Sequence, residues 1–153
     1  VYILKKWYTG AVVFRKIIFQ EDGTMLDTNR RFWKWFFLSI ITLGIYGLVF
    51  MCKYVRDLNI VCKADGKKTM NYIGMILLSA ITFGIYGIVW YYGVGKRLEQ
   101  GAIMRGLPPM TSGGSLLCWQ ILGACIVVGP FVAQAKMINA LNALCEDYNA
   151  KGR

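Results

Sequence analysis

One hydrophobic segment occurs twice in this chain, and it constrains the fold more than any other feature. Residues 38–49 read LSIITLGIYGLV and residues 78–89 read LSAITFGIYGIV, so nine of the twelve positions are identical at a separation of 40 residues. A repeat of this kind indicates a structural unit that packs against its neighbouring copies. The chain therefore contains at least two copies of one hydrophobic unit.

The apolar segments around the repeat carry no acidic or basic side chain. Three such windows cover residues 35–52, 69–95 and 106–135, and 56% of all residues are hydrophobic. Each window reaches the length of about 18–20 residues that a helix needs to enter a bilayer. In a soluble domain too little polar chain would remain to cover them. We therefore predict a membrane protein.

The predicted fold is an all-α membrane domain of three repeated hydrophobic units with a short N-terminal β-hairpin. The peripheral hairpin is expected in residues 1–28, where β-branched and aromatic residues flank an Asp22-Gly23 turn. The membrane domain would cover residues 29–153. Each unit would be a broken helix or a re-entrant helical hairpin, followed by an amphipathic helix. The units are predicted at about residues 30–66, 69–107 and 111–150.

The motif T-x-G-I-Y-G marks the middle of each unit. Two glycines beside β-branched residues weaken a helix, because Gly costs about 1 kcal/mol relative to Ala. The unit is therefore either a kinked span or a hairpin that enters the bilayer and returns, and the placement of the basic residues favours the hairpin. In a hairpin, the threonine and the tyrosine would help to satisfy the exposed backbone groups. The predicted structural positions are Thr42, Gly44, Tyr46 and Gly47, their repeats Thr82, Gly84, Tyr86 and Gly87, and Gly129 and Pro130 in a degenerate third copy.

The net charge of +10 results from 18 Lys and Arg residues and 8 Asp and Glu residues. The basic residues lie at the ends of the apolar windows, where each would contribute on the order of 1 kcal/mol to binding at an anionic membrane surface. Phospholipid therefore fits this pattern better than nucleic acid, which is not an expected partner. The predicted headgroup contacts are Arg30, Arg31, Lys34, Lys53, Arg56, Lys96 and Arg97.

The sequence offers little support for catalysis or metal binding. The chain has no histidine, and its five cysteines form no C-x-x-C pair. Asp57, next to Arg56, is interpreted as part of an exposed helical pair. We therefore expect neither an enzyme nor a cofactor, and no catalytic, cofactor-binding or metal-ligating residue is predicted.

Three functions are compatible with these features. The preferred one is a small integral membrane protein that forms a homo-oligomeric assembly or scaffold, with basic rims on anionic lipid. The first alternative is a homo-oligomeric pore or channel-like protein. The second alternative is a membrane anchor for a soluble partner protein that binds the N-terminal hairpin.

Several segments resemble a bacterial membrane-protein family known as domain of unknown function 4234. They are the two copies of T-x-G-I-Y-G with their flanks, the link at residues 104–108 and the segment AQAKMINALN at residues 133–142. The resemblance covers about residues 30–145. It implies an integral protein of the bacterial cytoplasmic membrane, and it brings no established activity, so it assigns no functional residue.

Overall fold

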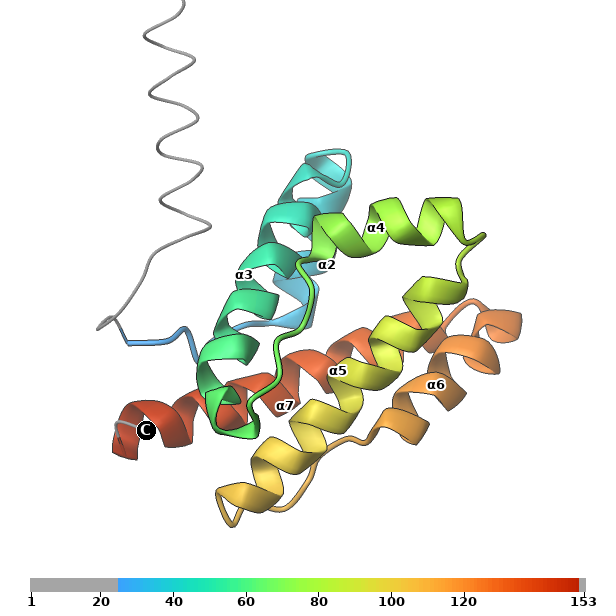
Figure 1. Cartoon of the computed structure of the whole chain (residues 1–153). Helices are drawn as coiled ribbons and strands as arrows, with labels where there is room; N and C mark the ends of the chain where they lie inside the picture. The colour runs from blue at the N-terminus through green and yellow to red at the C-terminus, as the bar shows by residue number, and fades with distance from the viewer. Residues whose placement is uncertain (1–24, 152–153) are drawn as a thin grey trace, which may run out of the picture.

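Six α-helices form three consecutive hairpins in residues 25–151, the part of the chain that the computed structural model describes (Figure 1). In each hairpin a short first helix is followed by a longer second helix. The long helix α7 contacts α2, α3, α5 and α6, so it holds the three hairpins together. The elements are α2 (Phe32–Ile41), α3 (Ile45–Val61), η1 (Lys63–Asp65), α4 (Tyr72–Ile81), α5 (Ile85–Met104), α6 (Gly113–Ile121), η2 (Gly123–Ile126) and α7 (Gly129–Lys151).

The first two hairpins turn at the T-x-G-I-Y-G motif, with the same hydrogen bonds in both copies. The Thr42 hydroxyl donates to the Leu38 carbonyl (2.7 Å) and accepts from the Tyr46 N–H (2.9 Å). Thr82 makes the two equivalent bonds at 2.8 and 3.1 Å. One hydroxyl therefore caps both the end of one helix and the start of the next.

The first glycine of the motif has a backbone conformation that disfavours other residues. Gly44 has a φ of 90° and Gly84 a φ of 87°, and glycine adopts this left-handed region without the steric cost of a Cβ atom. The preceding residues, Leu43 and Phe83, also have positive φ values of 51° and 50°. Two successive left-handed residues end the helix and reverse the chain.

The second glycine of the motif lets the two helices of a hairpin approach each other. A Cβ atom on Gly47 would lie 2.9 Å from the Ser39 Oγ, and one on Gly87 would lie 3.1 Å from the Ser79 Oγ. Both distances are shorter than an ordinary van der Waals contact. The repeated serine and the repeated glycine therefore form one packing contact in each hairpin.

The third hairpin turns in a different way. The short helix η2 lies between α6 and α7, and Gly123 packs so closely on Gly129 that a Cβ atom on Gly123 would lie 2.3 Å from the Gly129 Cα. Pro130 follows in the first turn of α7, where a missing N–H breaks no helical bond. The helix α7 thus begins at the predicted Gly129, but the turn before it differs from the turns of the first two hairpins.

The hydrophobic core lies where α3, α5 and α7 meet. It is formed mainly by the parts of these helices that lie farther from the hairpin turns. The Tyr54 hydroxyl is buried there and donates to the Met137 carbonyl at 2.8 Å. The other fully buried large side chains of this core include Leu58, Val94, Leu98, Leu116, Leu141 and Leu144.

The predicted fold class is wrong in its membrane-crossing segments. In residues 25–151, no helix has both the length and the apolarity required to cross a bilayer. The turns divide the first two uncharged windows, so that α2 and α4 contain only 10 residues each, or about 15 Å of helix. The expectation failed because the length of each window includes residues on both sides of the break, and the helix after the break continues into a charged segment.

The predicted amphipathic helices are not separate elements either. Each one continues without interruption from the apolar part of α3, α5 or α7. The backbone hydrogen bonds favour one long helix over two short ones when no capping residue or glycine turn intervenes. Each unit is therefore a hairpin with one short and one long helix.

The predicted β-hairpin of residues 1–28 lies for the most part outside the described residues. Its last residues, 25–28, form no strand, and no strand occurs elsewhere in residues 25–151. Leu26 is instead buried against α7, where its N–H and C=O bond the Asn149 side-chain amide at 2.9 and 2.8 Å. A long-range contact with α7 decides the conformation here.

Candidate lipid-contacting surface

Large apolar side chains are exposed at all three turns. The exposed fractions are 94% for Leu43, 97% for Phe83 and 72% for Val127. Contiguous apolar exposure of this kind marks a surface that contacts another apolar phase. We call these groups the apolar turns. They comprise Ile40, Ile41, Leu43 and Ile45 in the first, Ile81, Phe83 and Ile85 in the second, and Ile121, Leu122, Ile126, Val127 and Val128 in the third.

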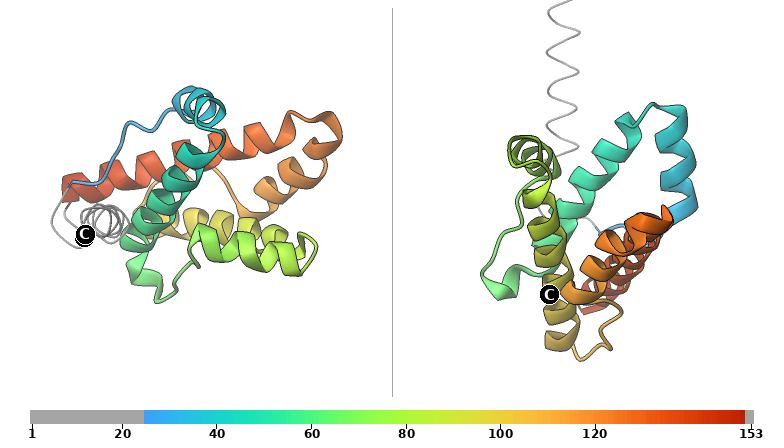
Figure 2. Two further views of the ribbon diagram at one scale, coloured as in Figure 1. Left: turned by 90° about the horizontal axis from the view of Figure 1, so that it is seen from above. Right: turned by 90° about the vertical axis from the view of Figure 1, so that its right-hand side faces the viewer.

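The three apolar turns lie on one side of the molecule. Figures 1 and 2 show the α2–α3, α4–α5 and α6–α7 turns away from the C-terminus, while the α3–α4 connection lies near the opposite end of the hairpins. The long helices α3, α5 and α7 diverge from the shared core toward the turns. The turns are therefore spread over a broad surface.

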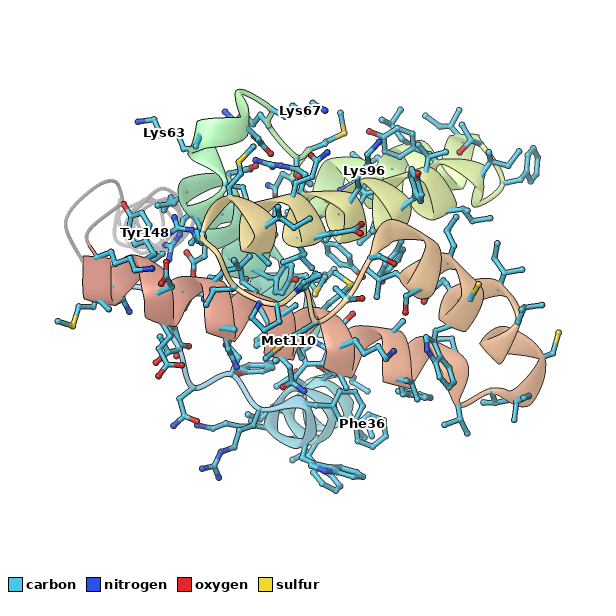
Figure 3. All side chains as sticks on the ribbon, turned by 90° about the horizontal axis from the view of Figure 1, so that it is seen from below. Phe36, Lys63, Lys67, Lys96, Met110 and Tyr148 are labelled. Atoms are coloured by element: carbon cyan, nitrogen blue, oxygen red, sulfur yellow. The ribbon has the colours of Figure 1, made fainter. Side chains whose placement is uncertain are left out.

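Exposed basic side chains lie farther from the apolar turns in the first two hairpins. Lys34 and Lys53 lie on the two helices of the first hairpin, and each is exposed. From the centre of the turn to Lys53 the helix extends about 15 Å, which is half of a hydrocarbon core about 30 Å thick. Figure 3 shows Lys67 and Lys96 at one edge of the molecule and Phe36 of α2 at the opposite edge. Exposed basic residues are thus present on both helices of the first hairpin and on α5 of the second.

These cations are free to bind an external anion. No carboxylate in residues 25–151 forms an ion pair with them. Four of the seven predicted headgroup contacts, which are Arg31, Lys34, Lys53 and Lys96, are thus exposed. Lys67 and Lys68 are among the exposed lysines that the prediction left out.

Arg30 is not exposed, although a headgroup contact was predicted for it. It forms a buried ion pair with Asp57, and the two side chains are only 3% and 1% exposed. Arg56, which is half-buried, bonds the other oxygen of the same carboxylate at 2.8 Å. The interpretation of Asp57 as an exposed residue is therefore wrong, because two arginines enclose it.

Arg97 is likewise buried, and it attaches the α3–α4 connection to α5. Its guanidinium donates to the Asp65 carboxylate (2.7 and 3.1 Å), to the Lys67 carbonyl (2.8 Å) and to the side chains of Asn59 and Thr69 (2.6 and 2.7 Å). Burial raises the pKa of Asp65, but hydrogen bonds and the charge of Arg97 outweigh it and hold this pKa below the ordinary 3.8. Arg97 therefore has a structural role.

A third ion-pair group joins α5 to the end of α7. Arg105 contacts Asp147 at 3.1 Å and donates to the Val61 carbonyl at 3.0 Å, while Lys151 contacts Asp147 at 2.6 Å. A cavity of about 490 Å³ lies beside this group and is lined in part by Cys62. Burial raises the pKa of the Cys62 thiol to about 11. The thiol is therefore protonated at neutral pH and is a weak nucleophile.

One signal in the sequence could have revealed the buried carboxylate. Asp57 lies three residues after Tyr54 and four before Val61, so it shares the helix face that these buried residues define. A carboxylate on an apolar face requires a cationic partner. No comparable local signal marks Asp65, which lies in the short helix η1.

A comparison with known protein families gives a match to part of the chain. Residues 30–100 match the model of a family described as Domain of unknown function (DUF4234). The matched range contains the first hairpin and most of the second, so the expected resemblance is confirmed over these residues. No curated protein and no solved structure matches the chain.

Proposed function

We propose that this protein is held in a membrane by its three apolar turns, which enter the hydrocarbon of one leaflet while the exposed basic residues contact anionic headgroups. The observation that carries this proposal is the exposure of large apolar side chains at every turn. Water solvates such side chains poorly, and each one that enters an apolar phase contributes about 1.5–3 kcal/mol.

The order of exposed side chains along α5 supports a lipid surface in particular. Starting from the turn, the apolar residues Ile85, Ile88 and Val89 come first, then the aromatic residue Tyr92, and then the cation Lys96. Hydrocarbon, interface and phosphate follow in the same order in a leaflet, and aromatic residues favour the interface. The resemblance makes the bacterial cytoplasmic membrane the proposed location.

We further propose a scaffold in which copies of the chain associate in the membrane. Exposed apolar side chains continue along the short helices, with Trp33 65%, Phe37 56% and Leu77 62% exposed. A second copy of the chain could pack against these apolar faces of α2 and α4 within the membrane. Size-exclusion chromatography with light scattering in a mild detergent should show one defined oligomer, and a monomer would contradict the scaffold.

The pore alternative has less support. A pore needs polar side chains that are available to line it. The hydroxyls of Thr42 and Thr82 are instead hydrogen-bonded within their own turns. The scaffold is therefore the preferred form of an assembly.

The membrane proposal is tested by placing charge in the apolar turns. The double variant L43D/F83D changes the two most exposed of these side chains, and Asp tolerates their positive φ better than most residues. Because two apolar side chains would be lost from the hydrocarbon, flotation with vesicles of phosphatidylcholine and phosphatidylglycerol should fall at least about a hundredfold.

A matched variant controls for added charge. N139D/A150D introduces the same two charges at exposed positions of α7, outside the apolar turns, and it should float like the unmodified protein. Circular dichroism should show the same helix content for both variants. Equal flotation of L43D/F83D and N139D/A150D would contradict insertion of the turns.

A further inference from the structure

Two grooves occupy equivalent places in the first two hairpins. Groove 1 lies between α3 and the segment at residues 25–34 and has a volume of about 390 Å³. Groove 2 lies between α5 and the α3–α4 connection and has a volume of about 250 Å³. Nine of the twelve residues that line groove 1 have a counterpart 40 positions later among those that line groove 2. The duplication has therefore produced two copies of one surface feature.

One wall of each groove is aromatic and apolar. Tyr46, Val49 and Phe50 form it in groove 1, and their repeats Tyr86, Val89 and Trp90 form it in groove 2. In groove 2 a hydrogen bond of 3.1 Å from the Trp90 indole to the Met70 carbonyl orients the ring. These walls lead along α3 and α5 toward the apolar turns.

The other end of each groove is cationic. Arg31, Lys34 and Lys53 line groove 1, and Lys67, Lys68 and Lys96 line groove 2. All six are exposed, and none forms an ion pair with a carboxylate in residues 25–151. No cation of one set occupies the same position in the repeat as a cation of the other set, yet both sets place three unpaired cations beside the aromatic wall.

Buried ion pairs support the cationic end of both grooves. Asp57 lines groove 1 and Arg97 lines groove 2 at the equivalent position, and each pairs with an oppositely charged residue, Arg30 and Asp65 respectively. The pair of Arg97 and Asp65 is internally neutral, whereas both Arg30 and Arg56 contact Asp57, so this buried group has a net positive charge. The Asp27 side chain also lines groove 1, where the exposed cations outnumber it. Both copies of the repeat thus have an ion pair beside the groove, although the shared position is an aspartate, Asp57, in the first copy and an arginine, Arg97, in the second.

The third hairpin has no equivalent groove, for a visible reason. When Gly129 is aligned with Gly44, the positions of Lys53 and Arg56 are taken by Ile138 and Leu141. Both side chains are fully buried in the core. Its only basic residue near this place, Lys136, lies over the Trp119 ring at 5.6 Å. The third hairpin therefore lacks the set of cations that lines the two grooves.

We infer that each groove binds one anionic phospholipid, with the headgroup phosphate at the three cations and the acyl chains along the aromatic wall toward the apolar turn. This inference deepens the proposed function, on which it rests. A free phosphate would use only the cations, whereas a phospholipid also covers the apolar wall that both grooves share. Unpaired cations beside an aromatic wall match the headgroup layer of an anionic leaflet.

The binding is measured without a membrane, by native mass spectrometry of the purified chain in a mild detergent. With added phosphatidylglycerol each chain should retain two lipid molecules, and with phosphatidylcholine it should retain none. In K67Q/K68Q/K96Q and in R31Q/K34Q/K53Q, one of the two lipids should be lost, because three cations lost from a site weaken binding by about a hundredfold. The combined variant should retain no lipid.

Charge alone is controlled by K63E/N139D, which removes the same net charge at exposed positions outside both grooves. This variant should retain two lipids. Retention of two lipids by the triple variants, or equal retention of both lipid types, would overturn the inference. Displacement of the lipid by water-soluble glycerol phosphate at the same concentration would also overturn it, because the apolar wall would then have no part in binding.

Flotation separates this result from the proposed function. If the chain floats with vesicles but retains no phosphatidylglycerol in detergent, the grooves are not lipid sites and the membrane proposal stands. If it retains two lipids but does not float, the grooves are confirmed and insertion of the apolar turns is contradicted.

Discussion

At the scale of single residues, Thr42 and Thr82 give the clearest link between sequence and structure. Each hydroxyl donates to one helix and accepts from the next, so a single side chain holds the two helices of a hairpin at their turn. The sequence predicted a helix break at these motifs. It did not predict that one oxygen would serve both helices, because this depends on the left-handed backbone of the two residues that follow.

Removal of this hydroxyl should destabilise the first hairpin. T42V keeps the size of the side chain, but it breaks both hydrogen bonds and leaves the Tyr46 N–H without its partner. We expect the free energy of unfolding to fall by about 1–3 kcal/mol, as measured by chemical denaturation in a mild detergent.

The matched control is T28V. Thr28 is exposed, and its hydroxyl makes no hydrogen bond within residues 25–151, so its replacement should change the stability little. Should T42V prove as stable as T28V, the glycine conformation alone would hold the turn.

Residue-scale prediction was least successful for the arginines. Arg30 and Arg97 occur in the same kind of basic segment as Lys34 and Lys96, yet the arginines are buried and the lysines are exposed. Their aspartate partners lie 27 and 32 positions away in the sequence. A local pattern of charges contains no information about such distant partners.

At the scale of helices, the position of each break decides what the hydrophobic windows become. A break near the middle of a window yields two short apolar arms, and the second arm joins the following amphipathic segment into one helix such as α3 or α5. The first half of this long helix carries exposed apolar residues, and the second half packs in the core. One helix thus connects the proposed lipid phase to the folded core.

The close approach of the helices within a hairpin also depends on the repeat. Gly47 and Gly87 each lie against a serine of the preceding helix. The structure shows that the partner of each glycine is the other helix of the same hairpin. The spacing of the glycines did not predict this partner, because a glycine on one helix face can contact either the other helix of its hairpin or a helix of another hairpin.

At the scale of the whole molecule, buried ion pairs attach segments that are remote in the sequence. Arg30 and Asp57 join the start of the described chain to α3, Arg97 and Asp65 join α5 to the α3–α4 connection, and Asp147 joins α7 to α5 through Arg105. Removal of one partner from a buried pair leaves a charge without compensation, which costs more than the pair contributes. The arrangement of the hairpins therefore depends on these pairs as well as on the apolar core.

The pair of Arg97 and Asp65 makes a prediction about pH. The pKa of Asp65 lies below 3.8 in the folded protein, so the carboxylate stabilises the fold above this value. That stability is lost as the pH falls from 3.8 through the lower folded-state pKa. The melting temperature of D65N should therefore lie below that of the unmodified protein at neutral pH, and the difference should shrink in this acidic range.

E146Q is the control for this experiment, because Glu146 is exposed and forms no ion pair within residues 25–151. Its melting temperature should follow that of the unmodified protein at every pH. A difference for D65N that stays constant through the acidic range would show that the lost stability does not come from the charge of Asp65.

The sequence by itself determined the two copies of the repeat and the helix breaks at their glycine motifs, because these follow from local properties such as side-chain polarity and glycine flexibility. Only the tertiary structure decided that α3, α5 and α7 share one core, which arginines are buried, and that two sets of cations face equivalent grooves. Those features depend on contacts between residues far apart in the chain, and local preferences do not specify such contacts.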